Sequence, residues 1–182
     1  MRGLVLVNAA SGPDDTSLGH MWSLFPGADV VAVDPPRVQH QLDAHLDPGR
    51  PFVAVAGGDG TIRTVAGAVV EGGGPPLLPV PTGTRNHFAR AVGIPELEDA
   101  AAAVRDGEVI HVDVAQVNGH WFVNNSSLGV YPDAVVKRER LQRRMPKTVA
   151  RWLAAWHQLR GGRPFDVRVG GRSFRAWLVF VG

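Results

Sequence analysis

The sequence predicts an α/β protein built on a Rossmann-like parallel sheet, and three observations support this fold class. Four short apolar runs alternate with segments whose apolar residues recur at helical spacing. Apart from Asp29 in the second, each run is apolar throughout, which is typical of parallel strands covered by helices on both faces. Three of the runs end in turns rich in glycine, asparagine or threonine, and the turns after parallel strands gather at the carboxyl edge of the sheet, where ligands bind.

The elements of this α/β part follow from the apolar runs and from the prolines and glycines between them. The prolines after Asp34 close the second strand, and the glycines at 72–74 end the helix that follows the third strand. Strands are therefore expected over residues 3–7, 28–33, 52–56 and 77–80, and helices over 18–25, 38–46, 62–70, 88–92 and 97–105.

Beyond these helices the pattern changes to antiparallel strands. Two hairpins are expected, with turns at Asn118-Gly119 and Gly170-Gly171. Their strands are expected over residues 109–117, 120–126, 165–169 and 173–181. We therefore predict an α/β domain over residues 1–111 and an antiparallel β domain over 112–182. The second domain is expected to be unfinished at Gly182, because its last strand runs to the final residue.

The composition is that of a soluble globular protein. Of the 182 residues, 45% are hydrophobic and 20% are charged. The chain has no cysteine, which excludes disulfides, thiolate metal sites and cysteine nucleophiles and fits a cytoplasmic location. The first apolar run is too short for a signal peptide, and no stretch reaches the length of a membrane span. Any membrane contact is therefore expected to be peripheral.

Positive charge gathers toward the C-terminus. Residues 1–136 contain 7 Lys/Arg and 15 Asp/Glu, a balance of −8, whereas residues 137–182 contain 12 and 2, a balance of +10. This asymmetry indicates an anionic partner, a membrane surface or a nucleic acid, unless the stretch is an ordinary solvated face. The basic stretch 137–144 lacks the interleaved aromatic residues of a nucleic-acid motif, so we favour an anionic membrane surface and expect no nucleic acid.

A further helix is expected over residues 146–159, with Pro146 at its start. Trp152 and Trp156 lie four residues apart and so share one face of this helix. We favour packing of the two indoles in the core or in the contact of a homodimer over their insertion at a membrane interface.

The stretch Gly57-Gly58-Asp59-Gly60-Thr61 joins a buried strand to a helix and predicts a phosphate-binding turn. Glycines let the main chain approach a ligand closely, and the first turn of a helix presents unpaired N–H groups to an anion. Asp59 would repel phosphate on its own, so we expect it to act with a divalent cation or to accept hydrogen bonds from N–H groups of the loop. Thr61 is expected to cap the helix or to donate to a phosphate oxygen. The competing interpretation is a tight turn in which Asp59 only caps the helix.

This loop differs from the two common nucleotide loops. It lacks the Gly-Lys-Ser/Thr ending of a Walker loop and the G-x-G-x-x-G pattern of a dinucleotide-binding turn.

Three motifs taken together resemble the diacylglycerol kinase catalytic family, which includes bacterial diacylglycerol and related lipid kinases and the sphingosine and ceramide kinases. The motifs are 8–12, 57–61 and 81–90, in the order and spacing of the lipid-kinase branch; NAD kinases share the middle one. Residues 122–129 are similar to the segment that opens the family's second domain. The resemblance covers the whole chain. It implies a nucleotide-binding α/β domain over residues 1–111 and an incomplete β-sandwich domain, with a basic helical insertion, over 112–182.

The resemblance also implies an activity, namely ATP-dependent phosphorylation of a lipid hydroxyl such as that of diacylglycerol, with Mg²⁺ as the second cofactor. Asp59 is the catalytic candidate within this chain and the candidate ligand of Mg²⁺, directly or through water. The residues carried over to the nucleotide site are Asn8, Ala9, Ala10, Ser11, Gly12, Gly57, Gly58, Asp59, Gly60, Thr61, Ile62, Arg63 and Thr84.

Some positions depart from the family pattern. Ala9 stands where proline is usual, and His87 replaces an aspartate that often follows the asparagine. The family's general base is an acidic residue late in the β-sandwich, which we expect beyond Gly182, because Asp166 lacks the glycine-rich setting of that base. We therefore predict that this chain binds nucleotide and phosphorylates lipid poorly or not at all. The alternatives are an NAD kinase-like enzyme and a non-catalytic, nucleotide-binding regulatory fragment.

Overall fold

The computed structural model describes residues 2–8, 18–34, 45–129 and 164–182. Contacts divide the chain into two compact units, Met1–Asn124 and Asn125–Gly182. The predicted domain boundary between residues 111 and 112 stays a prediction.

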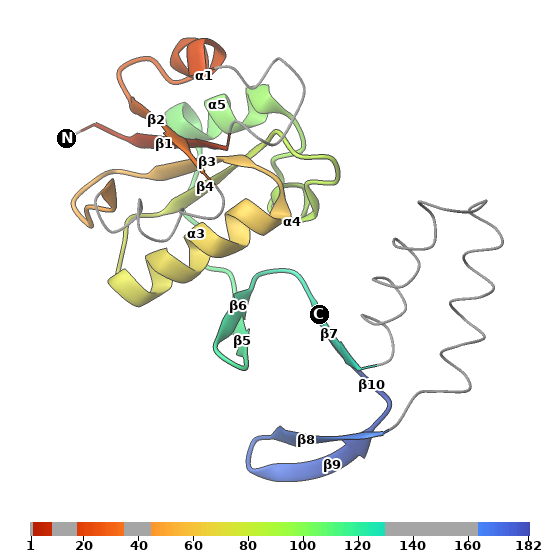
Figure 1. Cartoon of the computed structure of the whole chain (residues 1–182). Coiled ribbons are helices and arrows are strands. Elements are labelled where there is room, and N and C mark those ends of the chain that lie inside the picture. Colours follow the sequence, from red (N-terminus) through yellow and green to blue (C-terminus); the bar gives the residue numbers. More distant parts are fainter. Residues whose placement is uncertain (1, 9–17, 35–44, 130–163) are drawn as a thin grey trace, which may run out of the picture. The chain divides into compact units, whose positions relative to one another are not determined.

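The first unit contains a four-stranded parallel sheet with the order β2-β1-β3-β4 (Figure 1). Its strands are β1 (Leu4–Asn8), β2 (Asp29–Val33), β3 (Val53–Gly57) and β4 (Leu77–Pro81), and every pairing is parallel. All residues of β1 and β3 are buried, as expected for central strands covered on both faces. The predicted α/β fold class is confirmed.

Helices cover both faces of this sheet. They are α1 (Leu18–Leu24), α3 (Asp59–Gly72), α4 (His87–Ala91) and α5 (Leu97–Asp106). Alternate residues of β1 pack into two separate cores: Leu4 and Leu6 pack with residues of α3 and α4, whereas Val5 and Val7 pack with residues of α1 and α5. Figure 1 accordingly shows α3 on one side of the sheet and α1 and α5 on the other. The helix predicted over 38–46 lies mostly outside the described residues.

A short hairpin follows this α/β layer and packs on α3. Its strands are β5 (Ala115–Val117) and β6 (His120–Phe122), paired antiparallel. Asn118 and Gly119 both have positive φ, 49° and 79°, which confirms the predicted turn. Trp121 lies across Gly67 of α3, so closely that a Cβ on that glycine would be 2.6 Å from the indole Cδ1. The Trp121 indole N–H donates to the Glu71 carboxylate at 2.7 Å.

The long strand predicted over 109–117 is wrong for most of its length, since only its last three residues form β5. Val109, Ile110 and Val112 are instead exposed and line an apolar groove of about 910 Å³ that also borders β4. The sequence run is apolar, but none of the described strands pairs with it, and an apolar run without a partner strand does not form a sheet.

The second unit contains two antiparallel strand pairs. Strand β7 (Ser126–Gly129) pairs with β10 (Leu178–Val181), and β8 (Phe165–Val169) pairs with β9 (Arg172–Ala176). Gly170 and Gly171 both have positive φ in the predicted turn. The single strand predicted over 173–181 is wrong. A bend at Trp177 separates β9 from β10, and the two strands pair with different partners.

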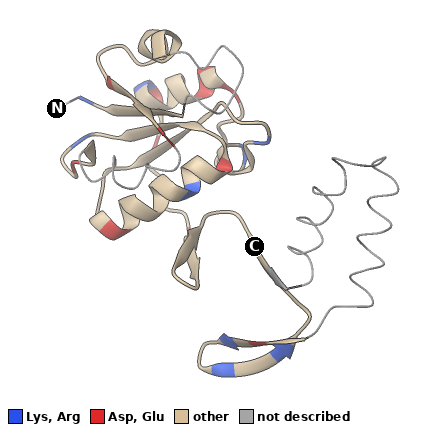
Figure 2. Cartoon of the chain, viewed as in Figure 1, with Lys and Arg blue, Asp and Glu red and all other residues tan. Residues whose placement is uncertain are grey.

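Figure 2 shows arginines along the β8–β9 hairpin and acidic residues spread over the α/β unit. The basic stretch 137–144 and the helix predicted over 146–159, with Trp152 and Trp156, lie outside the described residues. Of the helices that the structure describes, none combines the length and the apolar character needed to cross a bilayer.

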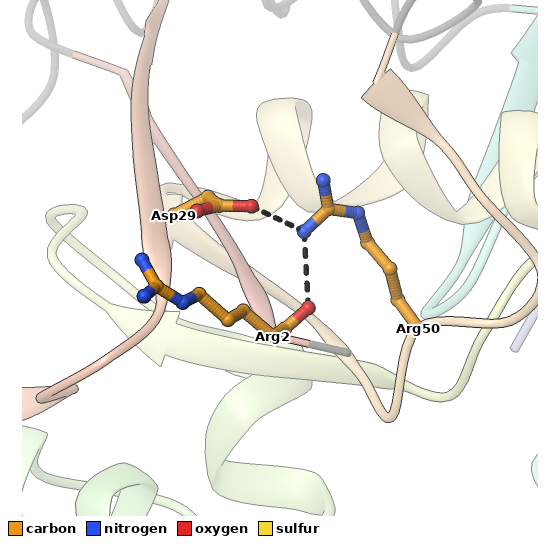
Figure 3. Close-up of polar contacts among 3 residues, drawn as sticks. All are labelled: Arg2, Asp29 and Arg50. Carbon is orange, nitrogen blue, oxygen red and sulfur yellow. Dashed lines mark hydrogen bonds and ion pairs between the residues drawn. The ribbon is translucent and has the colours of Figure 1, made fainter.

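An ion pair joins the amino ends of β2 and β1 to the segment before β3 (Figure 3). Arg50 Nη1 donates to Asp29 Oδ2 at 2.7 Å and to the carbonyl oxygen of Arg2 at 3.0 Å. The hydrogen bond from Arg50 is the largest influence on the pKa of the Asp29 carboxyl and lowers it below its ordinary value of 3.8. Burial acts in the opposite direction, and the positive charges of Arg50 and Arg2 lower the pKa further.

We expect Asp29→Asn to reduce the acid sensitivity of folding. The pKa of Asp29 is lower in the folded than in the unfolded chain, so its contribution is fully present above pH 3.8 and is lost as the pH falls through the folded-state pKa. Urea unfolding at a series of pH values between about 6 and 2.5 measures this dependence. Asp106→Asn, at an exposed pair with Arg105 of 3.9 Å, is the control and should leave the pH profile unchanged. Identical pH profiles for Asp29→Asn and the unaltered chain would contradict the expectation.

Candidate functional site

The end of β1 and the turns after β3 and β4 lie at the carboxyl edge of the parallel sheet, as predicted. Asn8 is the last residue of β1, and Gly57 pairs with Pro81 at the ends of β3 and β4. The side-chain amide of Asn8 donates to the Thr61 hydroxyl oxygen at 2.8 Å, and both residues are buried. Thr61 therefore ties the glycine turn to the end of the neighbouring strand rather than capping α3.

The turns after β3 and β4 touch through their main chains. A Cβ added to Gly83 would lie 2.4 Å from the Cα of Gly58, far inside van der Waals contact. Only a residue without a side chain at position 83 allows this approach. The two turns therefore form one continuous main-chain surface.

Asn86 fixes the shape of the second turn. Its backbone is left-handed, with φ 50°, a conformation that asparagine adopts more readily than most residues. Its side-chain oxygen accepts from the Gly83 N–H at 2.9 Å, and its side-chain nitrogen donates to the Gly83 carbonyl at 2.8 Å. Because this amide is engaged within the turn, it does not cap the helix α4 that follows.

Asp59 caps α4 instead, although it belongs to a different helix. Its Oδ1 accepts from the Phe88 N–H at 2.9 Å and its Oδ2 accepts from the His87 N–H at 3.2 Å, so the first two N–H groups of α4 are bonded. The side-chain amide of Asn124 donates to Oδ1 at 3.3 Å. One carboxylate thus holds together the glycine turn, the start of α4 and the segment after β6.

The glycines of the first turn are required for different reasons. A Cβ on Gly57 would lie 2.8 Å from the Cβ of Thr61, so packing within the protein excludes a side chain there. A Cβ on Gly58 would meet its nearest described neighbour at 3.6 Å, and a Cβ on Gly60 would meet no described atom within 4 Å. Neither residue has a positive φ. Folding of the described residues therefore does not require glycine at 58 or 60.

The predicted site residues separate into three groups. Asn8, Gly57, Gly58, Asp59, Gly60 and Thr61 are brought together at the edge, with Thr84 exposed on the second turn. Ile62 does not reach this edge with its side chain, which is fully buried in the core, and its N–H donates to the Gly58 carbonyl. Arg63 is exposed on α3, where it lines a separate cavity of about 280 Å³ beside Trp121. Ala9, Ala10, Ser11 and Gly12 lie outside the described residues.

Sequence reasoning assigned no role to Asn86 or Asn124. For Asn86 a signal was present, since asparagine between a glycine turn and a helix is typical of a left-handed residue. For Asn124 no local pattern predicts a contact 65 positions away.

We expect Thr61→Val to destabilise the chain by about 2 kcal/mol, because it removes the acceptor of a buried amide donor while keeping the side-chain volume. Thr64→Val is the matched control on the same helix, since its hydroxyl donates only to the Gly60 carbonyl at an exposed position, and it should change stability by no more than about 0.5 kcal/mol. Urea unfolding measures both. Equal effects would show that the bond between Asn8 and Thr61 adds nothing specific.

Comparisons with known proteins identify the family of this chain. Residues 2–117 match the family model for the diacylglycerol kinase catalytic domain. The chain is 42% identical over 89 residues to a probable lipid kinase YegS-like of Pseudomonas aeruginosa, covering 48% of this chain and 30% of the relative. It is 34% identical over 133 residues to the diacylglycerol kinase of Bacillus subtilis, covering 70% of this chain and 44% of the relative.

A putative diacylglycerol kinase from Bacillus anthracis has the same fold, with a TM-score of 0.68 and 22% identity over all of this chain and 66% of that one. The chain spans less than half the length of the two curated relatives. The family model covers well over half of the chain and includes the strands and turns that build the site. The chain therefore belongs to the diacylglycerol kinase catalytic-domain family.

Proposed function

We propose that this chain carries the nucleotide-binding part of a lipid kinase, in which the γ-phosphoryl group of ATP is transferred to a lipid hydroxyl such as that of diacylglycerol. The observation that carries the proposal is the glycine turn. Gly58 and Gly60 are unnecessary for packing and for backbone conformation among the described residues, so close approach of a ligand is the remaining reason for them.

The ligand that fits such a turn is a polyphosphate. The N–H groups of Asp59 and Gly60, the first two of α3, have no acceptor within the helix, whereas the Thr61 N–H donates to the Gly58 carbonyl at 2.9 Å. The positive end of the helix dipole lies at the same place. Bare main chain there lets phosphate oxygens approach these donors. We assign the phosphates to residues 57–61 and propose that Thr84 and residues 8–12 line the same site.

Mg²⁺ fits this site as a companion of the nucleotide. It is usually held by one or two carboxylates together with substrate phosphates and water, so a dedicated cluster of ligands is not needed. No group of three or more His, Asp or Glu side chains suited to a metal occurs among the described residues. Asp59 would hold the ion through Oδ2, which accepts one hydrogen bond from the described residues and so has a second lone pair for the ion. The ion would neutralise phosphate charge, which is much of what phosphoryl transfer requires.

We assign no general base among the described residues. Asp166 is exposed on β8 and lies 3.9 Å from Arg175, an arrangement without features of a catalytic carboxylate. We propose that the chain by itself binds nucleotide and transfers phosphate to lipid poorly. Radiolabelled transfer from ATP to a panel of lipids and to NAD measures this directly. Efficient transfer to lipid would contradict the second part of the proposal, and transfer to NAD would favour an NAD kinase-like enzyme.

We further propose a cytoplasmic protein that contacts anionic membranes peripherally through its basic stretch 137–144. Sedimentation with anionic vesicles at rising salt tests this, because binding through exposed charges falls as salt screens them. Binding that persists at high salt would point to apolar insertion instead.

The glycine turn is tested with Gly60→Ala. We expect about a tenfold or greater loss of ATP affinity with folding stability unchanged or slightly raised, because alanine favours the helix and its methyl group meets only the ligand. Gly72→Ala near the other end of α3 is the matched control, since it also has open space and should leave ATP affinity unchanged. Calorimetric titration with Mg²⁺-ATP measures affinity. Equal ATP affinity in the two variants would remove the support for a phosphate site at this turn.

A further inference from the structure

We infer that Asn124 is a positioning residue for Asp59, and that its side-chain amide leaves only one oxygen of this carboxylate open to a metal ion. The inference rests on the proposed function, since it concerns how Asp59 meets a Mg²⁺-nucleotide. It begins from the three hydrogen bonds that Asp59 accepts.

The two carboxylate oxygens differ in how many donors they meet. Each oxygen of a carboxylate has two lone pairs. Oδ1 accepts from the Phe88 N–H and from the Asn124 amide, so both of its lone pairs are used. Oδ2 accepts only from the His87 N–H among the described residues. Without Asn124 the two oxygens would be equivalent in this respect, each holding one main-chain donor of α4.

An amide is well suited to this task. It is a neutral donor, so it fills a lone pair of Asp59 without cancelling the negative charge that attracts a cation. A lysine or arginine at position 124 would compete with Mg²⁺ for that charge, and an aspartate would repel Asp59.

Packing of the neighbouring residue holds Asn124 near Asp59. Val123 is partly buried and packs against the core cluster formed by α3, α4 and the sheet. Asn124 itself is half-buried and is the last residue of the first compact unit. The amide is therefore delivered to Asp59 by packing of the segment after β6.

The test measures how strongly Mg²⁺ enhances ATP binding, as the ratio of the ATP dissociation constants without and with the ion. Without the amide, Asp59 no longer presents one defined oxygen to the ion, so we expect Asn124→Ala to lower this ratio about tenfold. ATP affinity without Mg²⁺ should change less than about twofold. Asn125→Ala is the matched control, because Asn125 is the exposed next residue, and it should leave the ratio unchanged. Asn124→Ser serves as a second variant if Asn124→Ala does not fold.

The ATP dissociation constant without Mg²⁺ separates positioning from a merely structural role. A general disturbance of the turn would weaken ATP binding both with and without the ion, whereas loss of positioning lowers only the ratio. An unchanged ratio in Asn124→Ala, an equal loss of ATP affinity with and without Mg²⁺, or ATP binding that ignores Mg²⁺ in the unaltered chain would overturn the inference while leaving nucleotide binding intact. Absence of ATP binding by the unaltered chain would overturn the proposed function and this inference with it.

Discussion

Replacing Asp59 by alanine is expected to abolish the enhancement of ATP binding by Mg²⁺ and to remove about 3 kcal/mol of folding stability. The stability loss follows because the first two N–H groups of α4 lose a charged acceptor, and bonds of this kind contribute about 1.5–3 kcal/mol each before partial replacement by water. The binding loss follows from the proposed role of Oδ2. Urea unfolding and ATP titration with and without Mg²⁺ measure the two effects separately.

Two variants show whether Asp59 is more than a helix cap. Asp59→Asn keeps one acceptor oxygen, so it should recover part of the stability while losing the dependence on Mg²⁺. Asp99→Ala removes an ordinary cap, since Asp99 accepts from the Glu96 N–H at the start of its own helix α5. It should cost about 1 kcal/mol and leave ATP binding unchanged. If Asp59→Ala resembles Asp99→Ala in both measurements, Asp59 is only a cap.

Much of the fold was predictable because the decisive signals are local. The apolar runs of β1 and β3 predict buried strands, and the helical spacing of Ile62 and Val65 places α3 on the sheet. The errors occur where the outcome depends on a distant partner. Val109 and Ile110 look like strand residues but have no described strand to pair with. The break at Trp177 follows from β9 and β10 pairing with different strands, which no property of the residue itself indicates.

The site shows the same division. The meeting of these strand ends was predictable, since strands that end in glycine and asparagine on a parallel sheet bring those ends to one edge. Its internal bonds were not. From the sequence, Asp59 was expected either to bind a cation or to accept hydrogen bonds from N–H groups of its own loop. The donors that it meets belong instead to α4, 28 and 29 positions further along the chain. Ile62 was predicted to contact nucleotide as a member of the motif, but its apolar side chain is buried in the core. Motif membership identifies a segment, and burial decides which of its residues reach a ligand.

Replacing Gly83 by alanine is expected to cost about 3 kcal/mol and to weaken ATP binding together with it. The added Cβ would lie 2.4 Å from the Cα of Gly58 and 2.8 Å from the side-chain oxygen of Asn86, so the two turns must separate. The obstructing atoms are main chain and a hydrogen-bonded amide, which do not rotate away, and insertion of a methyl group into packed structure costs about 1–3 kcal/mol. The φ of Gly83 lies outside the left-handed region, so the contact alone is responsible.

Gly58→Ala is the control for Gly83→Ala, because an added Cβ clashes at position 83 but not at position 58. A Cβ on Gly58 would meet the Cα of Gly83 at 3.6 Å, an ordinary contact, and the backbone of Gly58, with φ −81° and ψ 176°, suits alanine. Gly58→Ala should therefore cost no more than about 1 kcal/mol, most of it from the poorer capping by alanine. Urea unfolding of both variants measures the difference. If the two variants lose the same folding stability, the turns are not held main chain to main chain, and the surface proposed for phosphate loses its geometric basis. If only Gly83→Ala loses much stability while Gly58→Ala still weakens ATP binding, the glycine at 83 serves the fold and the glycine at 58 serves the ligand.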